Sequence, residues 1–204
     1  MNKNIFTILI ATLVFFSFTG CRDIDEDILT TPEEGVVING LRWATRNVAA
    51  PGSFVANPQD EGRVFQWNRR QGWHSTSGTA AWNSSGAEGT LWDSPNDPCP
   101  TGWRVPTRAE LQSLGLGTWT ENWNGTGVAG QVFGTAPSQL FLPAAGWRDA
   151  ADGRRFNAGT VGRYWSRTAS TAVNASFFGF NRLGSAHDDD NRAMGFGVRC
   201  VTAN

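Results

Sequence analysis

The stretch that decides the fold is "SAHDDDNRAMGFGVRC", residues 185–200, near the end of the chain. Its first half is polar, carries three consecutive aspartates and has no hydrophobic period, so we expect an exposed loop there. Its second half alternates Phe196, Val198 and Cys200 with small or charged residues, which is typical of a half-buried strand. This end of the domain is therefore predicted to combine a buried anchor with an exposed polar surface.

Further short strands are predicted upstream of this stretch. In "VVINGLRWATRNV", residues 36–48, apolar residues alternate on both sides of Asn39-Gly40, the strongest short signal for a hairpin turn. Strand-like runs also lie at residues 139–147 and 162–168, beside glycines. We find no internal repeat and no second domain, so residues 36–204 are expected to form one domain with a sizeable core.

One helix is predicted, within residues 97–115. Thr107 and Glu110 form a T-x-x-E capping box, Leu111 and Leu114 supply an apolar stripe, and Gly115 ends the helix.

The ten tryptophans and 24 glycines indicate a loop-rich domain held by large aromatic side chains. Residues 62–92, which are rich in Gly, Ser, Thr and Trp, are expected to be an ordered loop. Its anchors would be Trp67, Trp73, Trp82 and Trp92. The tryptophans expected in the core from their strand-like or motif segments are Trp43, Trp103 and Trp165. Those expected at the surface are Trp119 and Trp123.

The first 35 residues indicate export. An apolar run at residues 5–18 ends in Thr19-Gly20 before Cys21, which is typical of a signal peptide over residues 1–20. The run is too short for a membrane-spanning helix, which needs about 20 apolar residues. Residues 21–35 are acidic and are expected to form a solvated tether.

Cys21 after Thr-Gly resembles a bacterial lipobox, which implies that Cys21 is lipidated and becomes the mature N-terminus. The acidic run after it resembles the surface-export signal of Bacteroidetes lipoproteins, with a plain solvated linker as the alternative. Together they imply a protein anchored by lipid in the outer membrane and exposed at the cell surface. No other membrane attachment is predicted.

Charge and cysteine content narrow the possible partners. Without the signal peptide, which carries the only lysine, the chain has 16 Arg against 18 Asp and Glu. This small net negative charge creates no basic field for nucleic acid, so no nucleic-acid partner is predicted. Cys99 and Cys200 remain once Cys21 carries lipid, and in an oxidising envelope they most simply form a disulfide. Such a bridge would contribute ~4 kcal/mol in the chain-entropy model.

Three segments, "INGLRWATRNV", "CPTGWRVPT" and "GFGVRCV", resemble the Fibrobacter succinogenes major paralogous domain of Bacteroidetes lipoproteins. The resemblance runs from about residue 36 to residue 201 and implies a C-type-lectin-like α+β fold. Such a fold has a small antiparallel sheet in which the terminal strands meet, one or two helices and long irregular loops. The resemblance also implies an irregular, loop-built surface between Tyr164 and the last strand.

The sequence carries no recognisable catalytic motif, so we predict no catalytic residue, no cofactor and no enzyme. His74 and His187 lie more than a hundred residues apart, and the H-E-x-x-H, C-x-x-C and G-x-S-x-G motifs do not occur. Formylglycine-generating enzymes share the broad fold and use reactive cysteines near the end of the domain. Only Cys200 lies there, in a predicted strand, so a degenerate enzyme is a distant alternative.

The three aspartates raise the question of a metal. Asp188, Asp189, Asp190 and Asn191 offer the oxygen ligands that Ca²⁺ prefers. Adjacent residues of an extended segment point in alternating directions, however, so one ion can rarely use all three carboxylates. The Glu-Pro-Asn and Trp-Asn-Asp triplets of calcium-dependent lectins do not occur. We therefore predict no metal site and favour a hydrated acidic loop.

Residues 166–193 lack Lys, Gln, Glu, Met and Trp, the five residues that an Asn codon cannot become when its two adenines are randomised. With its flanking motifs this segment resembles the variable region of lectin-fold proteins diversified by retroelements. The resemblance implies a variable face that binds an unidentified protein or glycan; the alternative is an undiversified glycan-binding or structural surface lipoprotein. The predicted ligand-binding residues are Tyr164, Arg167, Ser170, Thr171, Asn174, Ser176, Phe178, Asn181, Arg182, Ser185, His187, Asp188, Asp189, Asp190 and Asn191.

Overall fold

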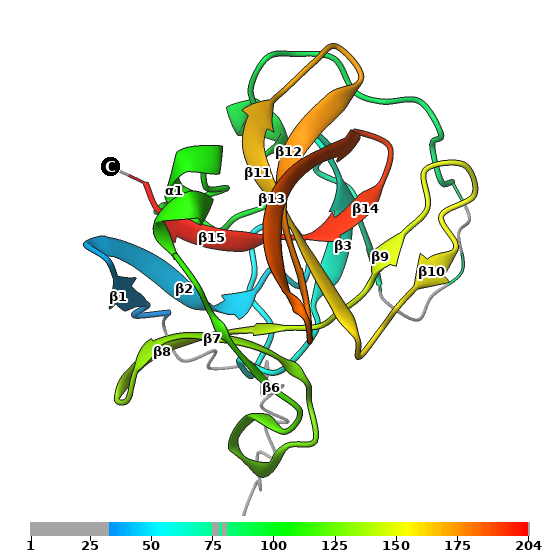
Figure 1. The fold of residues 1–204 in the computed structure, drawn as a ribbon. Coiled ribbons are helices and arrows are strands. Elements are labelled where there is room, and N and C mark those ends of the chain that lie inside the picture. The colour runs from blue at the N-terminus through cyan, green and yellow to red at the C-terminus, as the bar shows by residue number, and fades with distance from the viewer. Residues whose placement is uncertain (1–32, 75–77, 79–80, 204) are drawn as a thin grey trace, which may run out of the picture. The chain divides into compact units, whose positions relative to one another are not determined.

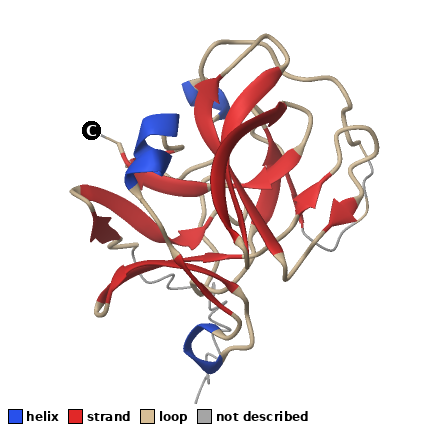
Figure 2. Cartoon of the chain, viewed as in Figure 1, coloured by secondary structure: helices blue, strands red, loops and turns tan. Residues whose placement is uncertain are grey.

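The computed structural model describes residues 33–74, 78 and 81–203, and within them the chain is built mostly from β-strands (Figure 1, Figure 2). The described helical segments are α1 (Arg108–Ser113) and two short 3-10 turns, η1 (Ser94–Asn96) and η2 (Trp123–Gly125). Of the expected α+β fold, the antiparallel sheets are confirmed, but the domain contains little helix. The predicted signal peptide, Cys21 and most of the tether lie outside the described residues. No helix among those described has the length and apolar character to cross a membrane.

The first and last strands meet in one sheet, as expected. Its order is β1 (Val36–Ile38), β2 (Leu41–Asn47), β15 (Arg199–Thr202) and β5 (Trp103–Arg104). The predicted hairpin is confirmed, because Ile38 pairs with Leu41 and both turn residues have positive φ, 49° at Asn39 and 84° at Gly40. Asn and Gly are the residues that tolerate this conformation.

The largest sheet carries the segment that the sequence marks as variable. Its order is β10 (Arg155–Phe156), β9 (Trp147–Arg148), β14 (Gly195–Gly197), β11 (Val161–Ala169), β12 (Asn174–Asn181) and β13 (Gly184–Asn191). β3 (Arg63–Gln66) joins it by pairing with β14, and β4 (Gly72–His74) pairs with β3. The sequence suggested that residues 62–92 form a loop. The structure shows that this segment also contains a strand, β3, which pairs with β14 about 130 residues away in the chain.

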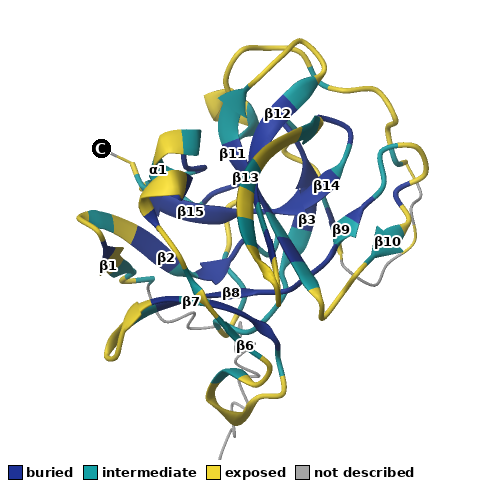
Figure 3. Ribbon diagram, in the orientation of Figure 1, coloured by how far each residue is buried: buried dark blue, intermediate teal, exposed yellow. Residues whose placement is uncertain are grey.

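A third, three-stranded sheet comprises β6 (Thr118–Thr120), β7 (Gly130–Thr135) and β8 (Ser138–Pro143). It contributes to one of two hydrophobic cores, which lie on opposite faces of the β11–β12 pair. Side chains alternate along a strand, so Tyr164 and Phe178 enter one core while Trp165 and Phe177 enter the other. The central strands are thus covered on both faces, and Figure 3 shows β12 largely buried and β13 largely exposed.

The closing strand differs from the prediction. It is divided at Val198 into β14 and β15, which belong to different sheets. Phe196, Val198 and Cys200 are buried as expected, but Arg199 between them is also 0 % exposed. Its guanidinium donates to Asn47 Oδ1 at 2.8 and 3.0 Å and to the Thr45 carbonyl at 2.7 Å. The segment is therefore buried on both sides rather than half-buried.

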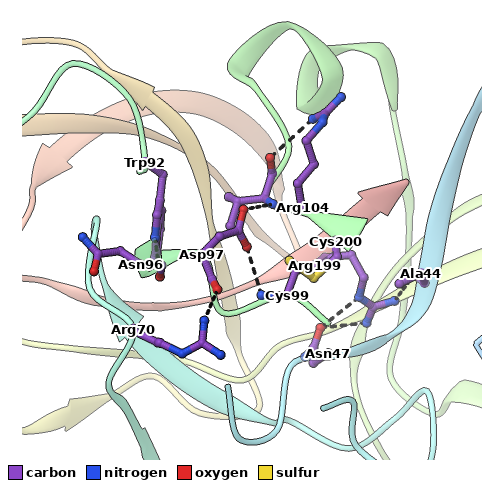
Figure 4. The surroundings of a disulfide bond; sticks show 11 residues. Ala44, Asn47, Arg70, Trp92, Asn96, Asp97, Cys99, Arg104, Arg199 and Cys200 are labelled. Carbon is purple, nitrogen blue, oxygen red and sulfur yellow. Dashed lines mark hydrogen bonds between the residues drawn. A yellow bond between two sulfur atoms is a disulfide. The ribbon is translucent and has the colours of Figure 1, made fainter. Parts of the chain in front are cut away.

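The predicted disulfide between Cys99 and Cys200 is present and joins β15 to the segment before β5 (Figure 4). Asp97 organises this corner, because its carboxylate accepts the N–H of Cys99 at 2.9 Å and that of Val105 at 3.1 Å. Burial of the Asp97 carboxylate raises its pKa despite these hydrogen bonds.

The predicted helix start is confirmed at α1. Glu110 donates its N–H to Thr107 Oγ1 at 3.2 Å, and Thr107 donates its own N–H to Glu110 Oε2 at 2.7 Å. Leu111 and Leu114 are buried, and Gly115 follows with a φ of 71°.

Of the three tryptophans expected in the core, Trp43 and Trp165 are fully buried, whereas Trp103 is only half-buried and packs at the core's edge against Phe54. Of the four expected anchors in residues 62–92, three are buried and Trp82 is half-buried. The expectation that Trp119 and Trp123 lie on the surface is wrong in part, because both are half-buried and pack against Phe180 and Phe141.

The last residues of the predicted tether, Glu33 to Gly35, belong to the folded domain. Glu33 accepts hydrogen bonds from the Thr45 N–H at 3.0 Å and from Arg46 Nε at 2.9 Å. Although burial of Glu33 opposes the shift, the hydrogen bonds from Arg46 and Thr45 leave its pKa below the ordinary value.

Candidate functional site

The polar run at residues 184–191 is a regular strand, not the irregular loop that the sequence suggested. β13 pairs antiparallel with β12 without interruption, from Asn181 opposite Gly184 to Asn174 opposite Asn191. It is the outermost strand of its sheet, as Figure 1 shows. Apolar residues of β12 are buried on both of its faces, and this burial fixes β12 in the sheet. β13 is extended because it is the hairpin partner of β12.

The three aspartates point to different faces of this hairpin. Asp189 accepts from the Ser176 hydroxyl at 2.6 Å and from Arg108 Nη1 at 3.0 Å. Asp190 lies on the opposite face and forms an ion pair with Arg163 at 2.9 Å. Among the described residues, no group of three or more His, Cys, Asp or Glu side chains is placed to hold a metal ion.

Two of the aspartates also cap the free edge of the sheet. The two-residue turn makes Asn181 and Gly184 the first hydrogen-bonded pair, so the odd-numbered N–H groups of β13 point away from β12. Asp188 Oδ1 accepts the N–H of Asp189, and Asp190 Oδ1 accepts that of Asn191, each at 2.8 Å. Side chains that occupy edge donors hinder another strand from pairing there.

Three predicted ligand-binding residues are not at the surface. Tyr164, Ser176 and Phe178 are 0 %, 1 % and 1 % exposed, so their placement on a ligand face is wrong. The Tyr164 hydroxyl donates to the Pro143 carbonyl at 2.9 Å, and burial raises the pKa of Tyr164 to about 12. The reason is that the β11–β12 pair is covered by a hydrophobic core on each face, which the sequence of these segments does not reveal.

The other predicted residues fall into two groups at opposite ends of β12. One group lies around the β11–β12 turn and comprises Arg167, Ser170, Thr171, Asn174, Asp189, Asp190 and Asn191. The second group lies around the β12–β13 turn and comprises Asn181, Arg182, Ser185, His187 and Asp188. The structure therefore does not bring all the predicted residues into one patch.

A shallow groove of about 430 Å³ lies beside the β12–β13 turn, and we call it the hairpin groove. Gly179 and Ala186, which face each other across β12 and β13, leave its middle open. A side chain at Gly179 would meet the Phe177 ring at 2.8 Å, so glycine allows that ring to lie along the groove. The groove is lined by Val161, Arg163, Phe177, Gly179, Phe180, Asn181, Leu183, Gly184, Ser185, Ala186 and Asp188.

Arg163, which the sequence analysis did not select, supplies a fixed cation at this groove. Its guanidinium lies 4.6 Å from the Trp147 ring centroid and 5.2 Å from that of Phe177, distances that allow cation–π attraction. Its ion pair with Asp190 holds it from the other side. The sequence feature that could have identified Arg163 is its position beside Tyr164 in the strand-like run.

His187 lies on the opposite face, half-buried against the Phe178 ring at 4.9 Å. Burial, aided by the nearby Arg108 cation, lowers the pKa of His187. A neutral imidazole packed on the core is a poor candidate for a charged ligand contact.

Comparison with models of known protein families, with curated proteins and with solved structures finds no match to this chain.

Proposed function

We propose that this chain is a lipid-anchored cell-surface binding protein with a C-type-lectin-like domain, and that it binds its ligand at the hairpin groove. The observation that carries the proposal is that three of the predicted ligand-binding residues come together at this groove. Asn181, Ser185 and Asp188 all line it. Tyr164, Ser176 and Phe178 act as the supporting core instead.

The chemistry of the groove favours a protein ligand. Leu183 at its rim is 94 % exposed and offers an apolar contact. Arg163 supplies a cation and Asp188 a carboxylate, and Phe177 also lines the groove. An apolar anchor flanked by charges of both signs suits a polypeptide segment with complementary side chains.

Binding is tested with the full chain in detergent against a phage-displayed random peptide library and a glycan array. Ala186→Arg fills the middle of the groove from an exposed position, and Ala172→Arg at the other end of β12 is the matched control. We expect peptides selected on the wild type to bind Ala186→Arg at least ~10-fold more weakly, a difference of about 1.4 kcal/mol. Peptides that bind both variants equally, or selection of glycans alone, would contradict a protein ligand at this groove.

We also propose that the exposed positions of the groove are diversified by a retroelement. Surface substitutions typically change stability by no more than about 0.5 kcal/mol, so a rigid hairpin tolerates variation at exposed positions. In the genome we expect a near-repeat of the segment that encodes residues 164–200, beside a reverse-transcriptase gene. Codons 181, 185 and 188 should differ between copies, whereas codons 164, 176 and 178 should not. A complete genome without such a repeat would remove this part of the proposal.

Lipid anchoring is tested separately by Cys21→Ser. We expect this variant to move from the membrane fraction to the soluble fraction and to lose incorporation of labelled fatty acid. Asp23→Ala, which keeps the cysteine, should remain with the membrane. Protein that stays in the membrane fraction without Cys21 would contradict the anchor.

A further inference from the structure

The two halves of the outer edge of β13 differ. The N–H groups of Asp189 and Asn191 are capped by the carboxylates of the preceding residues. The N–H groups of Ser185 and His187 also point away from β12, and neither donates a hydrogen bond within the described part of the chain. Edge groups that are neither capped nor paired form a template for another strand. We call residues 185–187 the open edge.

The open edge has a defined length. In an antiparallel hairpin, a residue whose N–H points outward also directs its C=O outward, so Ser185 and His187 each offer one donor and one acceptor. The open edge ends on one side at the β12–β13 turn and on the other at Asp189, whose N–H is occupied. It therefore has room for about three residues of extended chain, which suits a short segment rather than a long strand.

The open edge adjoins the hairpin groove. Ala186, its middle residue, is exposed and lines the groove. Residues directly opposite each other on paired strands place their side chains on the same face of the sheet. The ligand residue opposite Ala186 would therefore direct its side chain onto the face that carries the groove. Ala186 and Gly179 leave the middle of the groove open for that side chain.

The charge next to this position is negative. Asp188 lies two residues along the same face, and such diagonal neighbours, roughly 7–8 Å apart, are within reach of long side chains. Asp188 is exposed, and it forms no ion pair with any residue that the structure describes. The cation of the groove, Arg163, is already paired with Asp190. A lysine or arginine opposite Ala186 would therefore complement the site, with its aliphatic part over Ala186 and its cation at Asp188.

We propose that the open edge binds an extended segment of a partner protein as an added strand, with a lysine or arginine of that segment opposite Ala186. This inference rests on the proposed protein ligand at the hairpin groove and specifies how that ligand is held. Main-chain hydrogen bonds supply affinity in this mode, and the alternate side chains supply specificity. A second copy of this chain fits less well, because it would bring its own acidic strand, with Asp188 and Asp190, against this one.

Hydrogen exchange measured by NMR tests the added strand directly. The probes are synthetic peptides with the sequences that the phage-displayed library yields on the wild type, added to the full chain in detergent. We expect the amide protons of Ser185 and His187 to exchange at least ~10-fold more slowly in the complex, because they gain hydrogen bonds. The amide protons of Asp189 and Asn191 are already bonded and serve as internal controls, expected to change less than ~2-fold.

Two changes to the main chain test the same bonds by affinity. N-methylation of the peptide nitrogens that face β13, which are alternate positions, should weaken binding at least ~10-fold, whereas N-methylation of the positions between them should not. Ser185→Pro removes an outward N–H, which an edge strand tolerates because that group is not part of the ladder. We expect binding at least ~10-fold weaker, and Ser185→Ala, which keeps the N–H, should bind within ~2-fold of the wild type.

The charge is tested with Asp188→Asn. This variant keeps the side-chain oxygen that caps the Asp189 N–H and removes the negative charge. Peptides with a lysine or arginine should bind it at least ~5-fold more weakly. Asp152→Asn is the matched control, because Asp152 is exposed and its Oδ1 also accepts a nearby main-chain N–H, that of Arg154. Equal affinity for the two variants would overturn the role given to Asp188.

The outcomes separate this inference from the proposed function. Peptides that bind more weakly to Ala186→Arg but leave the amides of Ser185 and His187 unprotected would overturn the added strand and keep the groove as the ligand site. Failure to select any peptide would overturn both. A dimer with these amides already protected in the free protein would assign the edge to a second copy and overturn the proposal. If Ser185→Pro fails to fold, hydrogen exchange and the N-methylated peptides still decide.

Discussion

Ser176 and Asp189 lie directly opposite each other on β12 and β13, and the Ser176 hydroxyl donates a 2.6 Å hydrogen bond to Asp189 Oδ1. The same carboxylate oxygen accepts Arg108 Nη1 from helix α1 at 3.0 Å. Asp189 therefore ties the outermost strand to the helix, and this role distinguishes it from its two neighbours in the acidic run.

Asp189→Ala should lower the free energy of unfolding by about 1–2 kcal/mol. Hydrogen bonds to charged groups contribute roughly 1.5–3 kcal/mol, and the 34 % exposure of the Asp189 side chain reduces this by solvent screening. Urea denaturation measures the change, and Arg182→Ala at an exposed turn position is the control, expected within about 0.5 kcal/mol of the wild type. Equal stability of the two variants would show that Asp189 is only a surface residue.

Asp188 and Asp190 should keep the protein from associating through the edge of β13. The double variant Asp188→Ala/Asp190→Ala frees two edge N–H groups and removes two negative charges, so we expect dimers or larger species. Light scattering coupled to size-exclusion chromatography measures the mass. Glu34→Ala/Glu121→Ala removes the same charge elsewhere and should leave the elution unchanged. If both double variants associate, net charge rather than edge capping controls association; if neither does, the edge capping has no effect.

Arg199→Lys should destabilise the domain by about 3 kcal/mol. Burial lowers the pKa of Arg199 to about 10, so the guanidinium remains charged at neutral pH. Lysine cannot reproduce the forked donation to Asn47 and the backbone, and it would bury a less well satisfied charge. Chemical denaturation measures the loss, with Arg182→Lys as the exposed control. A loss below ~1 kcal/mol would contradict a structural role for this arginine.

The Arg104–Glu110 ion pair should contribute to acid sensitivity. Its hydrogen bonds lower the pKa of Glu110 from 4.5 to about 2, so the folded state holds the proton less tightly than the unfolded chain. This contribution is complete above pH about 4.5 and is lost as pH falls towards 2. Allowing for partial exposure, we expect about 1–2 kcal/mol. Melting curves between these pH values should lose stability less steeply with acid for Glu110→Gln than for the wild type, and parallel curves would refute the contribution.

Loss of the disulfide should cost about 2–4 kcal/mol, because the unfolded chain regains the freedom of a loop of 101 residues. The double variant Cys99→Ala/Cys200→Ala tests this by urea denaturation under oxidising conditions. Mass analysis of the non-reduced wild type should show the two cysteine peptides linked. Free thiols in protein taken from the cell envelope would contradict the bond in the cell.

The features that the sequence determined by itself depend on neighbouring residues. The Asn39-Gly40 turn needs only two residues that tolerate positive φ, and the start of α1 needs only the Thr107–Glu110 exchange of hydrogen bonds. The Cys99–Cys200 pair could be predicted because the chain has only three cysteines and the assignment of Cys21 to lipid left one pairing. Each of these features can be predicted from a few neighbouring residues or from the number of cysteines in the chain.

The tertiary structure alone decided the features that depend on distant partners. β13 is a strand because the buried residues of β12 pair with it, not because its own polar sequence favours extension. Arg199 is buried because Asn47 and the backbone of β2, about 150 residues away, satisfy its donors. The hairpin groove likewise forms where β11, β12 and β13 meet after folding. The local sequence does not reveal these features, because hydrogen bonds and apolar contacts between distant segments form only when the chain folds.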